Sequence, residues 1–137
     1  MGELINALTD QDVPSIRDAL GMQVALQGEG LELRSYQLNH DASRQAEYKK
    51  AGERFGKARL DYAQHELDSE ESSLLEQLEK LHAEYFDFGR KQFEDTAGMG
   101  TSRLLELESL ERNLSTPINR LLEKNSMVIK SEGDDSD

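Results

Sequence analysis

Several residue types are absent or scarce in this chain, and each absence excludes a class of protein or site. The 137 residues include no cysteine, which excludes disulfide bonds, thiolate zinc sites, attached c-type haem and cysteine nucleophiles. Lys and Arg number 16 against 28 Asp and Glu, giving a net charge of −12. So acidic a chain has no general attraction to nucleic acid or to anionic lipid, and a nucleic-acid-binding role is excluded.

Long apolar runs are also missing. The longest uncharged run, Ala19 to Gly28, has ten residues, whereas about 18 apolar residues are needed to cross a bilayer. No signal peptide precedes Met1. As it stands the chain is expected to be soluble, although an excised piece of a membrane protein would show the same pattern.

Strand-forming residues are few, which predicts an all-α fold. Val and Ile together number seven and Thr four, against 20 Leu. Ala, Leu, Glu, Lys and Arg make up 63 of 137 residues, close to the roughly half that is typical of long helices.

Helical periodicity runs through four stretches, which are separated by short clusters of Ser, Asp and Gly. The predicted spans are 13–38, 42–67, 69–97 and 101–130, with Ser69 as the N-cap of the third and Pro14 at the start of the first. Near-equal lengths and short connections predict an antiparallel up-down-up-down four-helix bundle. Residues 1–130 form the single domain, and the acidic residues 131–137 are expected to be a frayed tail or linker.

Each predicted helix carries an apolar stripe at steps of three and four residues, which is expected to face the core. In the second and third helices the stripes are Tyr48, Ala51, Phe55, Ala58, Tyr62 and His65, then Leu74, Leu78, Leu81, Tyr85 and Phe88. In the fourth the stripe contains Leu104, Leu107, Glu111, Leu114, Ile118, Leu121, Asn125 and Val128. In the first it contains Ile16, Leu20, Val24, Leu31 and Leu38.

The first helix has a second apolar stripe, displaced by roughly 120° from the first. It consists of Ala19, Met22, Leu26 and Leu33. If the core does not use this stripe, it predicts a homodimer interface in which Met22 and Leu26 contact their own copies. The alternative is a first helix with one wide apolar face.

The motifs of common enzymes and metal sites are not present in full. His82 follows Glu79 at the Glu-x-x-His spacing of di-iron bundles, but the second copy of the motif is missing, so no metal site is predicted. His82 is therefore interpreted as a surface or flanking residue. No nucleophile elbow or phosphate-binding glycine loop occurs, and neither an enzyme activity nor a cofactor is expected.

Glycines and arginines inside the helical stretches leave two questions open. Five helical glycines, each costing about 1 kcal/mol relative to Ala, indicate either close helix contacts or marginal stability; they are Gly28, Gly30, Gly52, Gly56 and Gly89. Arg34, Arg44 and Arg103 should all lie near the end of the bundle that holds the first and third connections. These cations either point outward or pair with Glu94, Asp95 and Glu106, or they form an anion pocket between helices.

The segment Leu33 to Tyr62, LRSYQLNHDASRQAEYKKAGERFGKARLDY, resembles the first-to-second helix junction of the four-helix-bundle sensor domains of bacterial transmembrane receptors. These receptors are methyl-accepting chemotaxis receptors and sensor histidine kinases. The likeness lies in a first helix that ends in Arg-x-Tyr-x-Leu, a polar turn with Asp, and a Tyr/Phe/Ala heptad helix. The stretch from Asp12 to Leu20, DVPSIRDAL, is similar to their opening helix.

The resemblance implies an extracytoplasmic sensor on the periplasmic side of the inner membrane, anchored by flanking membrane helices and paired as a dimer through its first helix. It also implies a small anionic ligand, such as an amino or organic acid, held by Arg34, Arg44 and Arg103 far from the membrane. A second hypothesis, from a different class, is a cytoplasmic scaffold bundle whose acidic surface meets a basic or helical partner.

Overall fold

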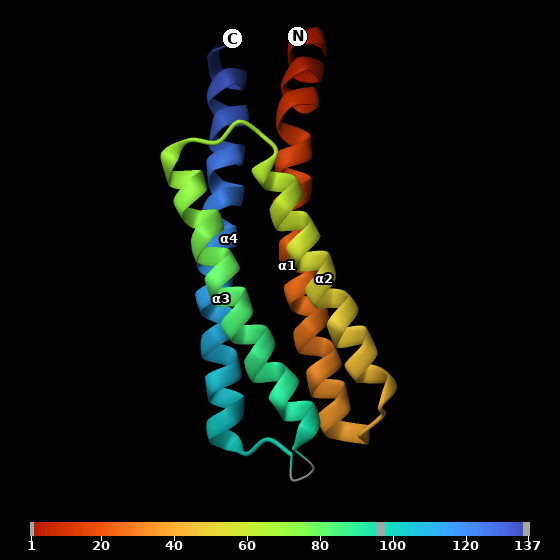
Figure 1. The fold of residues 1–137 in the computed structure, drawn as a ribbon. Helices are drawn as coiled ribbons and strands as arrows, with labels where there is room; N and C mark the ends of the chain where they lie inside the picture. The colour runs from red at the N-terminus through yellow and green to blue at the C-terminus, as the bar shows by residue number, and fades with distance from the viewer. Residues whose placement is uncertain (1, 96–97, 136–137) are drawn as a thin grey trace.

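The computed structural model describes the backbone of residues 2–95 and 98–135 and the side chains of residues 14–95 and 98–126. It contains four helices: α1 (Gly2–Asn39), α2 (Ser43–Ala63), α3 (Ser69–Glu94) and α4 (Thr101–Asp135). Consecutive helices run in opposite directions, and α1 also packs against α4, as Figure 1 shows. This architecture confirms the predicted all-α up-down-up-down bundle. None of the described helices is long and apolar enough to span a membrane.

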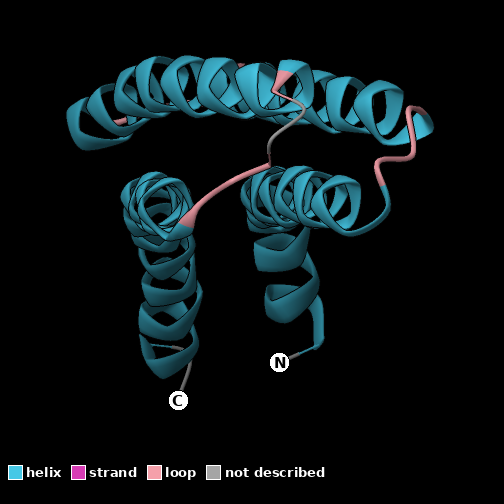
Figure 2. Ribbon diagram, turned by 90° about the horizontal axis from the view of Figure 1, so that it is seen from below, coloured by secondary structure: helices cyan, strands magenta, loops and turns pink. Residues whose placement is uncertain are grey.

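The two ends of the chain lie side by side. The first turns of α1 and the last turns of α4 extend together past the connection between α2 and α3 (Figure 1). The α1–α2 and α3–α4 connections lie at the opposite end, and the view from that end again places the chain ends beside each other (Figure 2). We call the end with these two connections the distal end, and the end that holds the chain termini the proximal end.

The helix boundaries differ from the predicted ones mainly at the chain ends. α1 begins at Gly2, so Pro14 lies inside the helix and the prediction that the helix starts there is wrong. α4 continues to Asp135, which makes residues 131–135 helical, while 136–137 lie outside the described residues. The N-cap of α3 is Asp68 and not Ser69: Asp68 accepts a hydrogen bond from the Glu71 N–H, and the Glu71 side chain accepts one from the Asp68 N–H.

The predicted stripes of α2, α3 and α4 supply most of the core. Its largest fully buried side chains on these helices are Tyr48, Phe55, Tyr62, Leu78, Tyr85, Leu107, Leu114, Ile118 and Leu121. Leu104, which begins the α4 stripe, is exposed, and the side chain of Val128 lies outside the described residues. Burying these aromatic and aliphatic groups stabilises the fold by roughly 1.5–3 kcal/mol for each large side chain.

The prediction for α1 has the two faces reversed. Leu20, Val24 and Leu31 are 43%, 62% and 61% exposed, and Leu38 is also exposed. The core instead takes the stripe that was assigned to a dimer interface, because Ala19, Met22, Leu26 and Leu33 are all buried within the bundle. That interface assignment is therefore wrong for these four side chains.

Small residues let α2 approach α1 closely. A Cβ at Gly21 would lie 3.3 Å from Cβ of Ala58, and a Cβ at Gly28 would lie 3.7 Å from Cβ of Ala51. These short distances bring α2 close to α1 along the line of Gly21 and Gly28, which at 100° per residue lies between the two stripes. Apolar periodicity does not distinguish the two stripes; the packing of α1 against the other helices does.

Candidate functional site

A group of polar side chains lies between α1, α3 and α4, with Glu29 fully buried and Arg34, 43% exposed, at its solvent edge. We call it the buried polar centre, and it consists of Glu29, Arg34, His82, Tyr85 and Glu111. Oε1 of Glu29, on α1, lies 2.6 Å from Nε2 of His82, on α3. The Glu29 side chain is fully buried and the His82 side chain is only 14% exposed. The interpretation of His82 as a surface or flanking residue is therefore wrong.

Glu29 is only partly satisfied by the bond to His82. Its other oxygen, Oε2, is buried and has no hydrogen-bond partner among the described residues. Burial raises the pKa of the Glu29 carboxyl above its ordinary value, and the nearby charge of Glu111 adds to the rise, while His82 opposes it. Glu29 when ionised therefore has His82 as its one side-chain hydrogen-bond partner among the described residues.

The second half of the buried polar centre joins α1 to α4. Nη2 and Nη1 of Arg34 donate to Oε1 and Oε2 of Glu111, at 2.6 and 3.0 Å. The Tyr85 hydroxyl donates to Oε2 of Glu111 at 3.2 Å. These bonds to Glu111 raise the pKa of Arg34, and burial raises the pKa of Tyr85, so both groups keep their protons throughout the physiological range.

Glycines make room for this centre. A Cβ at Gly30 would lie 2.5 Å from Oε2 of Glu111 and 2.6 Å from Nη1 of Arg34. A Cβ at Gly52 would lie 2.6 Å from the Phe86 ring. Of the two interpretations of the helical glycines, close contact is thus confirmed at these positions, whereas nothing lies within 4 Å of a Cβ at Gly56.

The other two predicted ligand-binding arginines are also paired with acids. Nη1 of Arg44 lies 3.0 Å from Oε2 of Glu32. Arg103 forms an ion pair with Asp95 and a hydrogen bond to Gln92. Among the described residues, no contact joins Arg34, Arg44 and Arg103 to one another. Each of the three arginines is instead paired with a carboxylate.

A cleft between α2 and α3 lies next to the buried pair. It has a volume of about 330 Å³ and is lined by Lys49, Gly52, Glu53, His82, Ala83 and Phe86. We call it the α2–α3 cleft. Its lining combines a cation, an imidazole and an aromatic ring.

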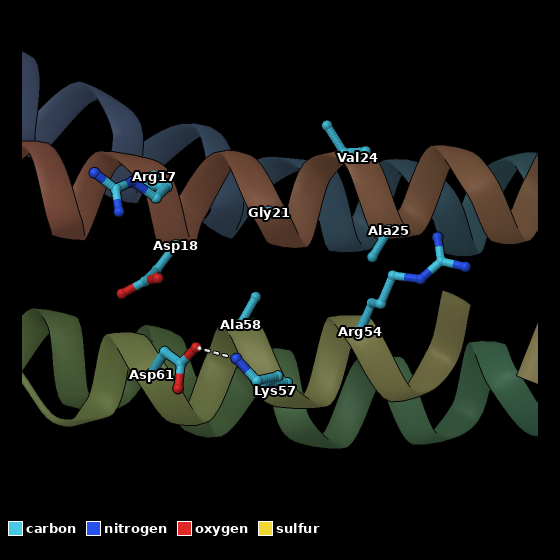
Figure 3. A pocket seen from close by; sticks show the side chains of 9 residues that line it. All are labelled: Arg17, Asp18, Gly21, Val24, Ala25, Arg54, Lys57, Ala58 and Asp61. Atoms are coloured by element: carbon cyan, nitrogen blue, oxygen red, sulfur yellow. Dashed lines mark hydrogen bonds and ion pairs between the residues drawn. The ribbon is translucent and has the colours of Figure 1, made fainter. Parts of the chain in front are cut away.

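A second hollow, of about 310 Å³, lies between α1 and α2 toward the proximal end. Figure 3 shows that Arg17 and Arg54, which both line it, point to opposite ends of the hollow. The third cation, Lys57, lies 3.3 Å from Oδ2 of Asp61. The three cations therefore do not converge on a single anion.

The described residues were also compared with the requirements of a metal site. Within the described residues, no three His, Cys, Asp or Glu side chains are grouped so that they could hold a metal ion.

Comparison with known proteins gives one informative match. No family model matches the sequence, and none of the curated proteins does. A solved structure described as the periplasmic sensor domain of a sensor histidine kinase superposes with a TM-score of 0.77, covering 94% of this chain and 92% of that one, at 15% sequence identity. This chain shares the four-helix fold of that domain. The sensor-domain fold confirms the architecture that the resemblance at Leu33 to Tyr62 implies, and it extends over nearly the whole chain.

Sequence reasoning missed four members of the buried polar centre as site residues: Glu29, His82, Tyr85 and Glu111. Glu111 did carry a signal, because it interrupts the apolar stripe of the fourth helix. Glu29 carried none, since it lies on the face of the first helix that was not assigned to the core.

Proposed function

We propose that this chain is the extracytoplasmic sensor domain of a membrane-anchored signalling receptor, of the histidine-kinase or chemotaxis-receptor type, located on the periplasmic side of the inner membrane. The observation that carries the proposal is the superposition on a periplasmic sensor domain over nearly the full length of both chains. The chain would be the sensing part of such a receptor and not its catalytic part.

The position of the chain ends supports this proposal. α1 and α4 leave the bundle together at the proximal end, where flanking membrane helices would continue them (Figure 1). A displacement of α4 along α1 would then pass directly to the membrane. The Arg34–Glu111 pair is a polar contact that such a displacement must strain, because it joins these two helices.

A small anionic ligand fits this arrangement as an input. An organic or amino acid that binds Arg34 would compete with Glu111 and would loosen α4 from α1. Arg44 and Arg103, also toward the distal end, would accept the same class of ligand by exchanging Glu32 and Asp95. In each case the resident carboxylate holds the arginine in place until the ligand replaces it.

We also propose that the domain pairs as a homodimer through α1, by a face different from the predicted one. The exposed residues Leu20, Val24, Leu31 and Leu38 are spaced by four, seven and seven, as in a heptad seam. Four exposed aliphatic side chains in one line favour a symmetric contact between two copies of α1.

Thermal unfolding against a set of organic and amino acids tests the sensing function. A ligand at 100 times its dissociation constant adds about 2.7 kcal/mol to the free energy of unfolding. The absence of any shift at millimolar concentration would contradict direct ligand binding.

The sequence of the full-length gene product tests the membrane anchoring. Apolar runs of about 20 residues on both sides of this segment would support the receptor. Soluble flanks would support the scaffold hypothesis instead.

A further inference from the structure

The α2–α3 cleft presents an amino group that no acid neutralises. Among the described residues, Lys49 has no carboxylate within ion-pair distance, whereas the adjacent Lys50 lies 3.4 Å from Glu47. The cleft therefore offers one available positive charge.

His82 forms a rigid polar wall of the same cleft. Its Nε2 is held by the buried Glu29 at 2.6 Å, and its ring stacks on Phe55 with centroids 4.0 Å apart and planes 5° from parallel. The ring cannot turn without losing both contacts. Nδ1 is thus the imidazole nitrogen that remains for another partner, and it carries a proton when Nε2 accepts one from Glu29.

Phe86 and Gly52 give the cleft an apolar side. Phe86 is half-buried and stacks on Tyr48 with centroids 4.9 Å apart, which fixes the orientation of its ring. A Cβ at position 52 would lie 2.6 Å from that ring, so any residue other than glycine there would displace Phe86. The volume of about 330 Å³ falls at the lower end of the range typical of small-molecule sites.

We propose that the α2–α3 cleft binds a small monocarboxylate with an aromatic or apolar tail. The carboxylate lies between the Lys49 ammonium and the free side of the His82 imidazole, and the tail packs on the Phe86 ring. Glu53 is an acid in the same lining, so a second carboxylate on the ligand is disfavoured. This inference rests on the proposed sensor function and assigns it a site other than Arg34, Arg44 and Arg103.

Binding in this cleft would reach α1 through one contact. A carboxylate that accepts a hydrogen bond from Nδ1 of His82 holds the imidazole ring from its second side, while Nε2 contacts Glu29 on α1. The ligand therefore acts on a contact that joins α3 to α1, the helix that leads toward the proximal end.

Benzoate is the probe that tests the site, with benzyl alcohol as the neutral control of the same shape and succinate as the dicarboxylate control. We expect millimolar benzoate to raise the melting temperature and to shift the His82 imidazole resonances, assigned with His40→Gln and His65→Gln variants. Benzyl alcohol and succinate should do neither. Lys49→Gln should weaken benzoate binding about 10- to 100-fold, as the loss of one charge-assisted hydrogen bond predicts. The matched control Lys50→Gln should leave it unchanged.

Two results would overturn the site while leaving the sensor function intact. One is a domain that is stabilised by other acids but not by benzoate. The other is benzoate binding that survives Lys49→Gln, leaves the His82 resonances unmoved and is lost in Arg34→Ala. A domain that responds to no acid and has soluble flanking sequences would instead contradict the sensor function itself.

Discussion

Nε2 of His82 lies 2.6 Å from Oε1 of Glu29, and this contact joins α3 to α1 in the middle of the bundle. The carboxylate is fully buried and its second oxygen has no partner among the described residues. A buried, half-satisfied carboxyl group reduces stability when it is ionised, unless the imidazole beside it carries the compensating charge.

The first prediction concerns the pH dependence that Glu29 contributes. The folded state raises the pKa of Glu29 above its ordinary 4.5. The contribution of Glu29 to the free energy of unfolding is therefore fully present below pH 4.5, where the group is neutral, and is lost as pH rises through the folded pKa. We expect Glu29→Gln, which does not ionise, to gain stability relative to the parent protein above pH 4.5, by at most about 1.4 kcal/mol per pH unit. Urea unfolding between pH 4 and 8 measures this difference.

Glu53→Gln is the control for this experiment, because Glu53 is exposed and on the rim of the cleft. Its stability difference from the parent should vary much less with pH. A stability difference between Glu29→Gln and the parent that stays constant with pH would contradict the raised pKa of Glu29.

The second prediction concerns Arg34. Its side chain is 43% exposed and that of Glu111 is 20% exposed, so solvent screens the pair and we expect Arg34→Ala to cost only about 0.5–1 kcal/mol. The helical circular dichroism should stay intact. If Arg34 holds an anionic ligand, the variant should also lose the ligand-induced stabilisation, while Arg112→Ala on α4 keeps it. An equal ligand response in Arg34→Ala would give Arg34 a structural role only.

The third prediction compares two glycines. A Cβ at Gly89 would lie 2.7 Å from Cζ of the fully buried Tyr48, and closer still to its hydroxyl. That hydroxyl donates to the Phe86 carbonyl at 2.9 Å. We expect Gly89→Ala to cost about 1–3 kcal/mol through overpacking, and Gly56→Ala, which meets nothing, to stabilise α2 by up to about 1 kcal/mol. Denaturant unfolding measures the change in the free energy of unfolding for each variant. Equal changes in the two variants would contradict the prediction.

The fourth prediction concerns two ion pairs toward the proximal end. Glu70 of α3 lies 3.0 Å from Arg120 and 2.8 Å from Lys124 of α4, and we call this cluster the Glu70 clamp. Bonds from Arg120 and then Lys124 lower the pKa of Glu70 to about 2. Its contribution to stability is therefore present above pH 4.5 and is lost as pH falls toward 2.

Glu70→Gln should accordingly be less stable than the parent at neutral pH and should converge with it in acid. Glu76→Gln, an exposed change on the same helix, should show no such convergence. The difference at neutral pH should also shrink in high salt, because the clamp is at the surface. A difference that does not respond to pH would contradict the clamp.

The fifth prediction separates the two apolar faces of α1. Leu31→Glu, on the exposed face, should keep the fold and shift a concentration-dependent monomer–dimer equilibrium toward monomer. Leu26→Glu would place a charge in the core, where Leu26 is 4% exposed, and should unfold the domain. Sedimentation over a concentration series, with circular dichroism of both variants, measures the two effects. A Leu31→Glu protein that dimerises as well as the parent would place the interface elsewhere.

The amino-acid sequence was enough to predict the fold class and the order of the helices. Scarce β-branched residues, four stretches of helical periodicity and short polar connections leave an up-down bundle as the simple solution. The stripes of α2, α3 and α4 were predictable because each of these helices has one dominant apolar face, as the buried Phe55, Leu78 and Leu114 confirm. The resemblance at the first connection also led to the fold of a sensor domain.

The packing of the helices fixes which face of α1 is buried and where the polar residues meet, and neither could be predicted from the sequence. Two apolar stripes of similar strength share that helix, and only its packing against the other helices selects the stripe with Met22, Leu26 and Leu33. That choice carries Glu29 into the core, opposite a histidine 53 positions away in the sequence. Periodicity records which residues share a face of one helix, whereas a pair such as Glu29 and His82 depends on the rotation of two helices relative to each other, which packing alone fixes.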